Sequence, residues 1–255
     1  MQTPVPDYLK HVLSQCQRNA GGQLADYIPE LAQADPNKLA LALSTADGMI
    51  YSSGDDGHEF TIQSMSKPFA YALVLEQLGI EEVLQKVGVE PSGEAFNQIS
   101  LDKELNIPKN PMINSGAITT HSLIQTTDGI SRAEQLRRFL SELAGRELSF
   151  DEQVYTSEMK TAFRNLSIGY MLRTVGALDT DPVEIVNGYI QQCAIKVTVK
   201  DLANIARVLA NGGLHPKTGE CLLDRAVVRQ VLSVMLSCGM YDAAGDWLTT
   251  VGIPA

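Results

Sequence analysis

Residues 64–78 read SMSKPFAYALVLEQL, and they predict a helix that begins at a serine, carries a lysine three residues later and is then mostly apolar. The run from Ala70 to Leu75 has the character of a buried segment, and Gly79 is placed to end it. Residues at positions i and i+3 share a helix face, so we expect Ser64 and Lys67 to be neighbours. The apolar turns that follow would draw both side chains toward a dry interior.

This S-x-x-K spacing is found in the serine β-lactamases and penicillin-binding proteins. A serine hydroxyl is a poor nucleophile until a base takes its proton, and a lysine is such a base only when burial lowers its pKa. The sequence therefore predicts that Ser64 is an acyl-forming nucleophile and that Lys67 is its base. The backbone N–H groups of a serine at a helix start also point toward a developing oxyanion.

The spacing is not specific by itself, because Ser100 with Lys103 and Ser157 with Lys160 repeat it. Those two pairs lie among acidic residues, where a lysine stays solvated and charged, so we interpret them as surface residues.

For the pair at 64 and 67, the alternative is a helix N-cap serine followed by a lysine in the first turn. A lysine there is unfavourable because its charge opposes the positive end of the helix dipole. Ser66 is a weaker candidate nucleophile than Ser64, because a residue adjacent to Lys67 points about 100° away around the helix.

Other patterns predict further helices and one β-hairpin. The hairpin follows from alternating leucines at 39, 41 and 43, a turn at 46–48 and an apolar run at 49–51. A first helix is indicated by apolar spacing from Leu9 to Cys16, with Gly21-Gly22 as its stop. Two more begin at the capping pairs Ser131/Glu134 and Thr198/Asp201 and end at Gly145 and Gly212-Gly213, respectively. A fourth begins at the cap Asp224. An isolated hairpin is marginal in water, so we expect either further strands or a natural chain that continues past Ala255.

Composition limits the classes of function. The 255 residues are 44% hydrophobic, enough for one sizeable core, and the net charge of −10 argues against nucleic acid as a partner. The N-terminus lacks signal-peptide features and no segment is long and apolar enough to span a bilayer, so we expect no membrane association and a cytoplasmic location. The four cysteines and four histidines are dispersed, which predicts reduced thiols, no metal site and no cofactor.

Several blocks in order along the chain resemble the serine-dependent glutaminase family. They are ADYIP at 25–29, IQSMSKP at 62–68, EPSG at 90–93, FN at 96–97, NPMINSGA at 110–117, RN at 164–165, SCGMY at 237–241 and VGIPA at 251–255. Ordered blocks of this kind are far more specific than one tetrapeptide.

The resemblance implies an α+β fold of the serine β-lactamase and penicillin-binding-protein type, with a helical lobe packed on an antiparallel sheet flanked by helices. It implies an amidohydrolase that converts L-glutamine and water to L-glutamate and ammonia, and a homodimer or homotetramer. By the same resemblance Ser64, Lys67, Tyr189 and Tyr241 are catalytic. Tyr241 would serve the leaving ammonia as proton donor, and the substrate pocket would comprise Tyr27, Gln63, Ser64, Asn114, Glu158, Asn165, Tyr189 and Tyr241.

The residue types suit free glutamine, because a buried carboxylate can hold its ammonium while amide and phenol groups hold its carboxylate. Each residue also has a structural alternative. These are turn chemistry for Asn114, a solvated helix face for Glu158, a helix cap for Asn165, packing for Tyr27, core aromatics with a wet hydroxyl for Tyr189 and Tyr241, and a backbone role only for Gln63.

The chain departs from the family at one end. Family members continue after the VGIPA block with a K-S-G strand, a glycine-rich turn and a closing helix, and that strand provides the second oxyanion-hole N–H. We therefore interpret residues 1–255 as a single glutaminase catalytic domain without its C-terminal strand and helix. The alternatives are a penicillin-recognising hydrolase of the same superfold and a non-catalytic oligomerising fragment.

Overall fold

The computed structural model describes residues 4–19, 21–102, 104–127, 129–216 and 218–255. Its strands are short and antiparallel: β1 (Ala40–Ser44), β2 (Ile50–Gly54), β3 (Phe60–Thr61), β4 (Ser149–Phe150) and β5 (Ile195–Val197).

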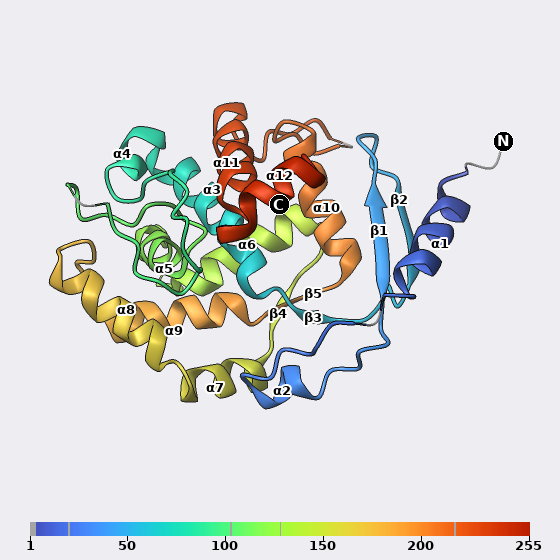
Figure 1. The fold of residues 1–255 in the computed structure, drawn as a ribbon. Coiled ribbons are helices and arrows are strands. Elements are labelled where there is room, and N and C mark those ends of the chain that lie inside the picture. The colour runs from blue at the N-terminus through green and yellow to red at the C-terminus, as the bar shows by residue number, and fades with distance from the viewer. Residues whose placement is uncertain (1–3, 20, 103, 128, 217) are drawn as a thin grey trace.

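Helices make up most of the molecule (Figure 1). They are α1 (Val5–Cys16), α2 (Pro29–Ala32), α3 (Lys67–Leu78), α4 (Ile80–Leu84), α5 (Asn114–Leu123), α6 (Arg132–Ala144), α7 (Glu152–Lys160), α8 (Phe163–Thr174), α9 (Pro182–Cys193), α10 (Val199–Ala210), α11 (Arg225–Cys238) and α12 (Ala244–Thr250), with 3-10 turns η1 (Gln63–Ser66) and η2 (Tyr241–Ala243).

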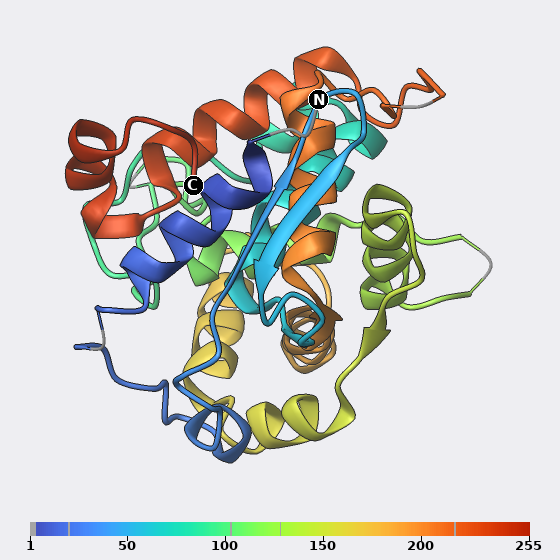
Figure 2. The same cartoon turned by 90° about the vertical axis from the view of Figure 1, so that its right-hand side faces the viewer.

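The predicted hairpin is confirmed. Strands β1 and β2 pair antiparallel with Leu41 opposite Ser53, and Gly48 takes a left-handed φ of 90° in the turn between them. Helix α1 packs beside β2 and α10 packs against β1, so helices flank the hairpin on both sides (Figures 1 and 2).

A second sheet was not predicted from the sequence. It has the order β3-β5-β4, so the antiparallel strands of the described residues divide into two small sheets. Its strands contain only two or three residues, too few to show an alternating pattern. The sheet matters for the site because β3 leads directly into η1, and the N–H of Ile62 still bonds the carbonyl of Ile195 at 2.8 Å.

The apolar helix predicted after Ser64 is confirmed, with a different start. Residues 63–66 form the 3-10 turn η1, and the α-helix α3 begins at Lys67. The side chain of Ser64 caps neither element, which removes the N-cap interpretation. Residues 67–75 of α3 are all buried, and Gly79 ends the helix with a φ of 85°.

The predicted capping signals are largely correct. Thr198 and Asp201 form a full capping box at α10, and Asp224 accepts from the N–H of Ala226 at 2.7 Å. Ser131 caps α6, but the carboxylate of Glu134 binds arginines instead of closing the box. The first helix ends at Cys16, earlier than the Gly21-Gly22 stop.

Beside a small cluster of Ile28, Val154 and Ala194, two larger apolar clusters form the core of the described residues. The larger one joins α3, α6, α10 and α11 with β5, and the other joins α5, α8 and α9. Asn114 begins α5, while Tyr189 belongs to the second cluster and Tyr241 packs on the first. Lys67, at the start of α3, therefore lies where the two clusters meet. Within the described residues, no helix is long and apolar enough to cross a membrane.

Candidate active site

Lys67 is buried at the centre of the candidate site. Its side chain is 1% exposed, and Nζ donates to Asn114 Oδ1 at 2.8 Å and to the Tyr241 hydroxyl at 3.4 Å. Nζ also lies 5.8 Å from the ring centre of Phe96 and 5.2 Å from that of Tyr241. Burial lowers the pKa of Lys67 to about 8, so a substantial fraction of the amine is neutral at mildly alkaline pH.

Ser64 lies one turn before Lys67 and shares Tyr241 with it. A hydrogen bond with Ser64 partly offsets the burial that raises the pKa of the Tyr241 phenol. Among the hydrogen bonds of the described residues, none joins Ser64 Oγ to Lys67 Nζ directly. Catalytic hydrogen bonds are often long without substrate and shorten in the complex, so this arrangement is compatible with proton transfer between them.

Two residues beside the nucleophile have strained backbones. Gln63 has a φ of 51° and Tyr241 a φ of 54°, in the left-handed region that non-glycine residues rarely occupy. The other described non-glycine residues there are Ser100 and Asn106. Half of this small set therefore lies at the Ser64 site, and backbone strain of this kind concentrates at functional sites.

Asn114 connects the base to the rest of the site. Its Oδ1 accepts from Lys67 Nζ and from the Tyr189 hydroxyl, the latter at 3.4 Å, while its Nδ2 donates to Asn165 Oδ1 at 3.0 Å. Burial raises the pKa of Tyr189 well above its usual value, so its hydroxyl remains a neutral donor. One buried amide thus links α3, α5, α8 and α9.

A second polar group lies beside this centre. Gln63 Nε2 donates to Glu158 Oε1 at 2.8 Å, and burial raises the pKa of the Glu158 carboxyl. Desolvation and the nearby charge of Glu158 raise the pKa of Tyr27 to about 12, although 56% of the tyrosine surface is exposed. A half-buried carboxylate with an open phenol beside it suits a ligand that carries an ammonium group.

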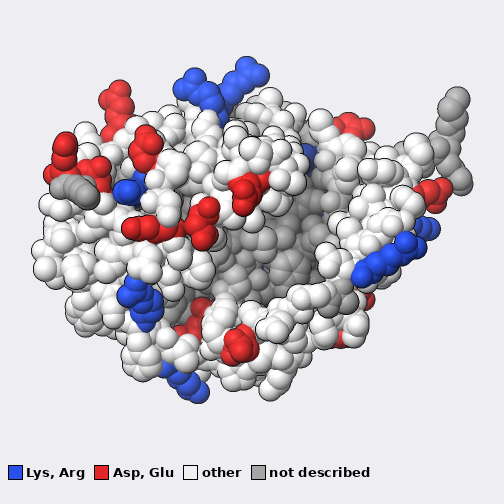
Figure 3. Space-filling model, in the orientation of Figure 1, with Lys and Arg blue, Asp and Glu red and all other residues white. Residues whose placement is uncertain are grey.

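A cavity of about 470 Å³ opens at the nucleophile. Ser64, Lys67 and Tyr241 line one part of it, and apolar side chains including Met112, Leu202 and Met235 line the rest. Figure 3 shows a hollow on this face, between the helical part and the hairpin with α1.

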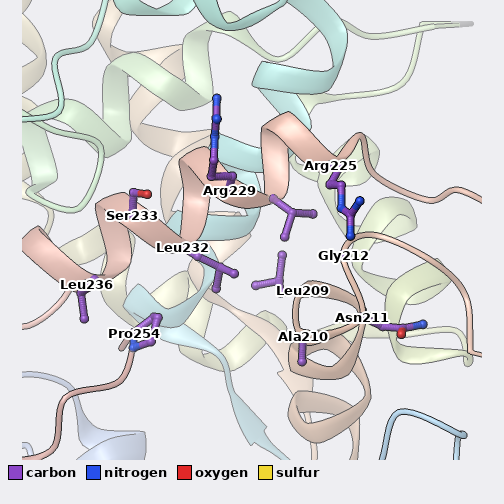
Figure 4. A pocket seen from close by; sticks show the side chains of 11 residues that line it. Leu209, Ala210, Asn211, Gly212, Arg225, Arg229, Leu232, Ser233, Leu236 and Pro254 are labelled. Atoms are coloured by element: carbon purple, nitrogen blue, oxygen red, sulfur yellow. The ribbon is translucent and has the colours of Figure 1, made fainter.

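A larger cavity, of about 590 Å³, contains none of the predicted site residues. It lies between α10, α11 and Pro254, where Figure 4 shows Leu209, Leu232 and Arg229 among its lining side chains. The volume of a cavity therefore does not by itself identify the candidate active site.

The structure brings the predicted site residues together and decides several alternatives. Asn114 is the first residue of α5, so it is not turn chemistry, and Asn165 lies inside α8, whose N-cap is Ala162. Glu158 is half-buried and not a solvated helix face. The Gln63 side chain bonds Glu158, which disfavours the alternative of a backbone role only.

The two repeated S-x-x-K pairs behave differently from Ser64 and Lys67. Lys160 is exposed, and Ser157 Oγ donates to Glu30 Oε1 at 2.8 Å. Lys103 lies outside the described residues, and Ser100 bonds Glu94.

Two neighbours of the base are absent from the site residues predicted from the sequence. The ring of Phe96 lies near Lys67 Nζ, and its centre is 5.4 Å from that of Tyr241. Cys193 is buried near Tyr189, and burial raises its thiol pKa to about 12. Phe96 belongs to the FN block at 96–97, which was a usable signal. Nothing in the sequence distinguished Cys193 from the other dispersed cysteines.

Comparison with known proteins gives a consistent result. The glutaminase family profile matches residues 22–255. A glutaminase of Corynebacterium glutamicum is 56% identical over 254 residues, covering 99% of this chain and 61% of that protein. A glutaminase of Microcystis aeruginosa is 43% identical, covering 99% of this chain and 75% of that protein.

Solved structures agree in fold. The structure of Mglu in its glutamate form has a TM-score of 0.94 at 49% identity and covers 100% of this chain and 59% of that one. A probable glutaminase of Bacillus subtilis has a TM-score of 0.89 at 32% identity, covering 98% of this chain and 78% of that one. The expected α+β, serine β-lactamase-like fold is therefore confirmed. The chain spans about 61% of the length of the Corynebacterium glutamicum relative.

Proposed function

The chain belongs to the glutaminase family, and on that premise we propose that it forms the catalytic part of an L-glutamine amidohydrolase in which Ser64 is the nucleophile and Lys67 its base. The observation that carries the proposal is the burial of Lys67, which lowers its pKa to about 8. A lysine with an ordinary pKa would be protonated at neutral pH and would not accept a proton from serine.

The hydrogen bonds of Lys67 support the first step. Neutral Nζ carries two N–H bonds, and Asn114 Oδ1 and the Tyr241 hydroxyl oxygen are in place to accept them. The lone pair then remains for the Ser64 hydroxyl proton. Ser64 Oγ attacks the side-chain amide carbon of glutamine, the C=O bond becomes an oxyanion, and the proton passes to Lys67. The backbone N–H of Ser64 is one proposed oxyanion donor.

Collapse of this intermediate breaks the C–N bond and leaves a glutamyl ester on Ser64. The departing nitrogen takes a proton and leaves as ammonia. We assign this proton to Tyr241, whose hydroxyl contacts both Ser64 and Lys67 and whose pKa is raised by burial. Lys67 then returns its proton to the Tyr241 oxygen, with which it is hydrogen-bonded, so that both groups are restored. Water attacks the ester, Lys67 accepts a proton from it and passes that proton to the departing Ser64 oxygen, and L-glutamate is released as product.

The other polar groups fit the two charged ends of the substrate. The Glu158 carboxylate, held by Gln63 Nε2, is the proposed partner of the glutamine ammonium. The Asn165 amide and the Tyr27 phenol are the proposed partners of its carboxylate, with Asn114 and Tyr189 completing the pocket beside the base. Holding both ends fixes the amide carbon against Ser64, which supplies orientation.

The proposal concerns the whole protein and includes its expected partners. L-Glutamate as a product ligand is in line with the glutamate form of Mglu, a protein of similar structure. A homodimer or homotetramer and a cytoplasmic location belong to the same proposal, and light scattering coupled to gel filtration tests the first of these.

Ammonia release from L-glutamine tests the proposal. In the protein at its natural length, Ser64→Ala is expected to reduce kcat by at least about 10³-fold, because catalysis without the nucleophile is residual. Ser167→Ala, an exposed serine on α8, is the matched control and should leave kcat unchanged. Equal activity of the parent and Ser64→Ala proteins would reject the nucleophile. Nitrocefin turnover without glutamine hydrolysis would favour the penicillin-recognising alternative.

A further inference from the structure

A buried chain of polar side chains runs toward the nucleophile from the side of α5 and α9. His121 Nδ1 lies 2.8 Å from Gln192 Oε1, Gln192 Nε2 donates to Ser66 Oγ at 3.0 Å, and Ser66 Oγ donates to the Gln63 carbonyl at 2.8 Å. The three side chains are 0% to 1% exposed. None of them belongs to the proposed catalytic or substrate-binding set.

The direction of this chain is fixed by its chemistry. Gln192 uses its amide nitrogen as donor to Ser66, so its oxygen is the atom that faces His121 and must accept. Burial lowers the pKa of His121 to about 4, so at neutral pH the ring has one N–H, which lies on Nδ1. Each link therefore donates toward the next, and the last proton points at the Gln63 carbonyl.

The series of hydrogen-bonded side chains ends at the Gln63 carbonyl, where the backbone geometry bears directly on the nucleophile. Gln63 has the left-handed φ of 51°, precedes Ser64, and holds Glu158 through its side chain. A residue in this conformation persists only when its surroundings over-determine it. The Ser66 hydroxyl supplies one such restraint on the peptide that joins Gln63 to Ser64.

Packing against His121 depends on a glycine. A Cβ at Gly188 of α9 would lie 2.4 Å from His121 Nε2, closer than any real contact, so the ring fits only because position 188 has no side chain. This approach holds the imidazole against Gln192, four residues further along the same helix.

We propose that His121, Gln192 and Ser66 form a positioning network that holds the Gln63–Ser64 peptide in its left-handed geometry and so sets the attack angle of the Ser64 hydroxyl. The proposal rests on the proposed function for its kinetic consequence only. Its structural consequence, a restrained turn at residues 63–66, does not depend on the reaction.

The kinetic test uses Ser66→Ala, Gln192→Met and the double variant in the protein at its natural length. We expect each to lower kcat by about 10-fold while KM for L-glutamine changes less than about 3-fold, because the substrate-end groups are untouched. The double variant should lose no more than either single variant, since both break the same chain. Losses that multiply, or a kcat equal to that of the parent, would overturn the proposal.

Gly188→Ala and Thr119→Val sharpen the test. The first removes no hydrogen-bonding group of the chain but displaces His121, and it should reproduce the kcat loss. The second removes an equally buried hydrogen bond of α5, from Thr119 Oγ1 to the Ser115 carbonyl, outside the network. It should reduce stability and leave kcat unchanged. A kcat loss in Thr119→Val like that of Ser66→Ala would reduce the effect to general destabilisation.

Hydrogen exchange followed by mass spectrometry separates this proposal from the proposed function. Exchange of the amides at 63–66 should become faster in Ser66→Ala, Gln192→Met and Gly188→Ala, and should stay at the parent rate in Thr119→Val. If the parent releases no ammonia from glutamine, the proposed function fails, and the exchange rates still decide the network. Unchanged exchange in all variants would overturn it.

Discussion

The substitution Asn114→Asp tests whether Lys67 is the base. In the parent, a pKa of about 8 means that about 9% of Lys67 is neutral at pH 7 and about 91% at pH 9, so kcat/KM should rise about 10-fold across that range. The substitution would place a carboxylate at the position from which Asn114 Oδ1 now contacts Nζ at 2.8 Å. An opposite charge at that distance favours the ammonium form and typically raises a pKa by about 1–3 units.

We therefore expect the alkaline limb of kcat/KM to move from about pH 8 to about pH 10 in Asn114→Asp. At pH 8 the neutral fraction of Lys67 would fall from about one half to about 1%, which lowers activity about 50-fold through the base alone. The substitution also removes the hydrogen bond from Asn114 Nδ2 to Asn165, which can change the maximal value of kcat/KM. The measured quantity is therefore the pH at the midpoint of the alkaline limb.

The assay is initial-rate ammonia release at subsaturating glutamine from pH 6 to pH 10.5. Asn187→Asp is the control, since it adds the same charge on α9, where Asn187 Oδ1 accepts from the Tyr155 hydroxyl. Its midpoint should lie within about half a unit of that of the parent. A midpoint for Asn114→Asp that stays at the parent value, with activity not recovered by pH 10, would refute the assignment of Lys67.

Three further outcomes concern stability. The proton binds Lys67 more weakly in the folded than in the unfolded chain, so Lys67→Met should stabilise the protein by about 3 kcal/mol at pH 7. This gain should shrink as the pH rises from 8 to 10.5. A lower free energy of unfolding than that of the parent, measured with urea at pH 7, would contradict this. Because burial depresses the pKa of His121 from 6.5 to about 4, about 3 kcal/mol of stability should be lost as pH falls through that window, and Tm against pH should be flatter in His121→Gln. Asp224→Ala should cost about 1 kcal/mol in urea unfolding, because it removes the cap of α11, and no loss would contradict that role.

Much of the fold could be predicted because its signals are local. The hairpin at 40–54, the helix after Ser64 and the caps at Thr198 and Asp224 each follow from side chains close in sequence. The β3-β5-β4 sheet could not be predicted, because its strands pair residues far apart in the chain and each is too short to carry a period.

The site shows the same division. Ser64 and Lys67 were found from their spacing and from the apolar turns after them, and the remaining polar residues from the family resemblance. The burial of Lys67 beside the rings of Phe96 and Tyr241, and the hydrogen bonds through Gln192, depend on contacts between segments that are distant in the sequence. Sequence spacing predicts which side chains are neighbours on one helix, and tertiary packing decides which amine becomes neutral.

The left-handed backbones of Gln63 and Tyr241 have a consequence for engineering. A non-glycine residue in this region costs on the order of 1 kcal/mol, and a glycine there would relieve that cost. Selection for heat resistance alone would therefore favour glycine at position 63, which borders the nucleophile, and would loosen the turn in doing so. At position 241 the tyrosine ring packs on the core, and its loss would cost more than the backbone relief. A thermostable variant library should hold positions 63 and 241 fixed and seek its gains elsewhere, for example among the exposed residues of α1 and α8.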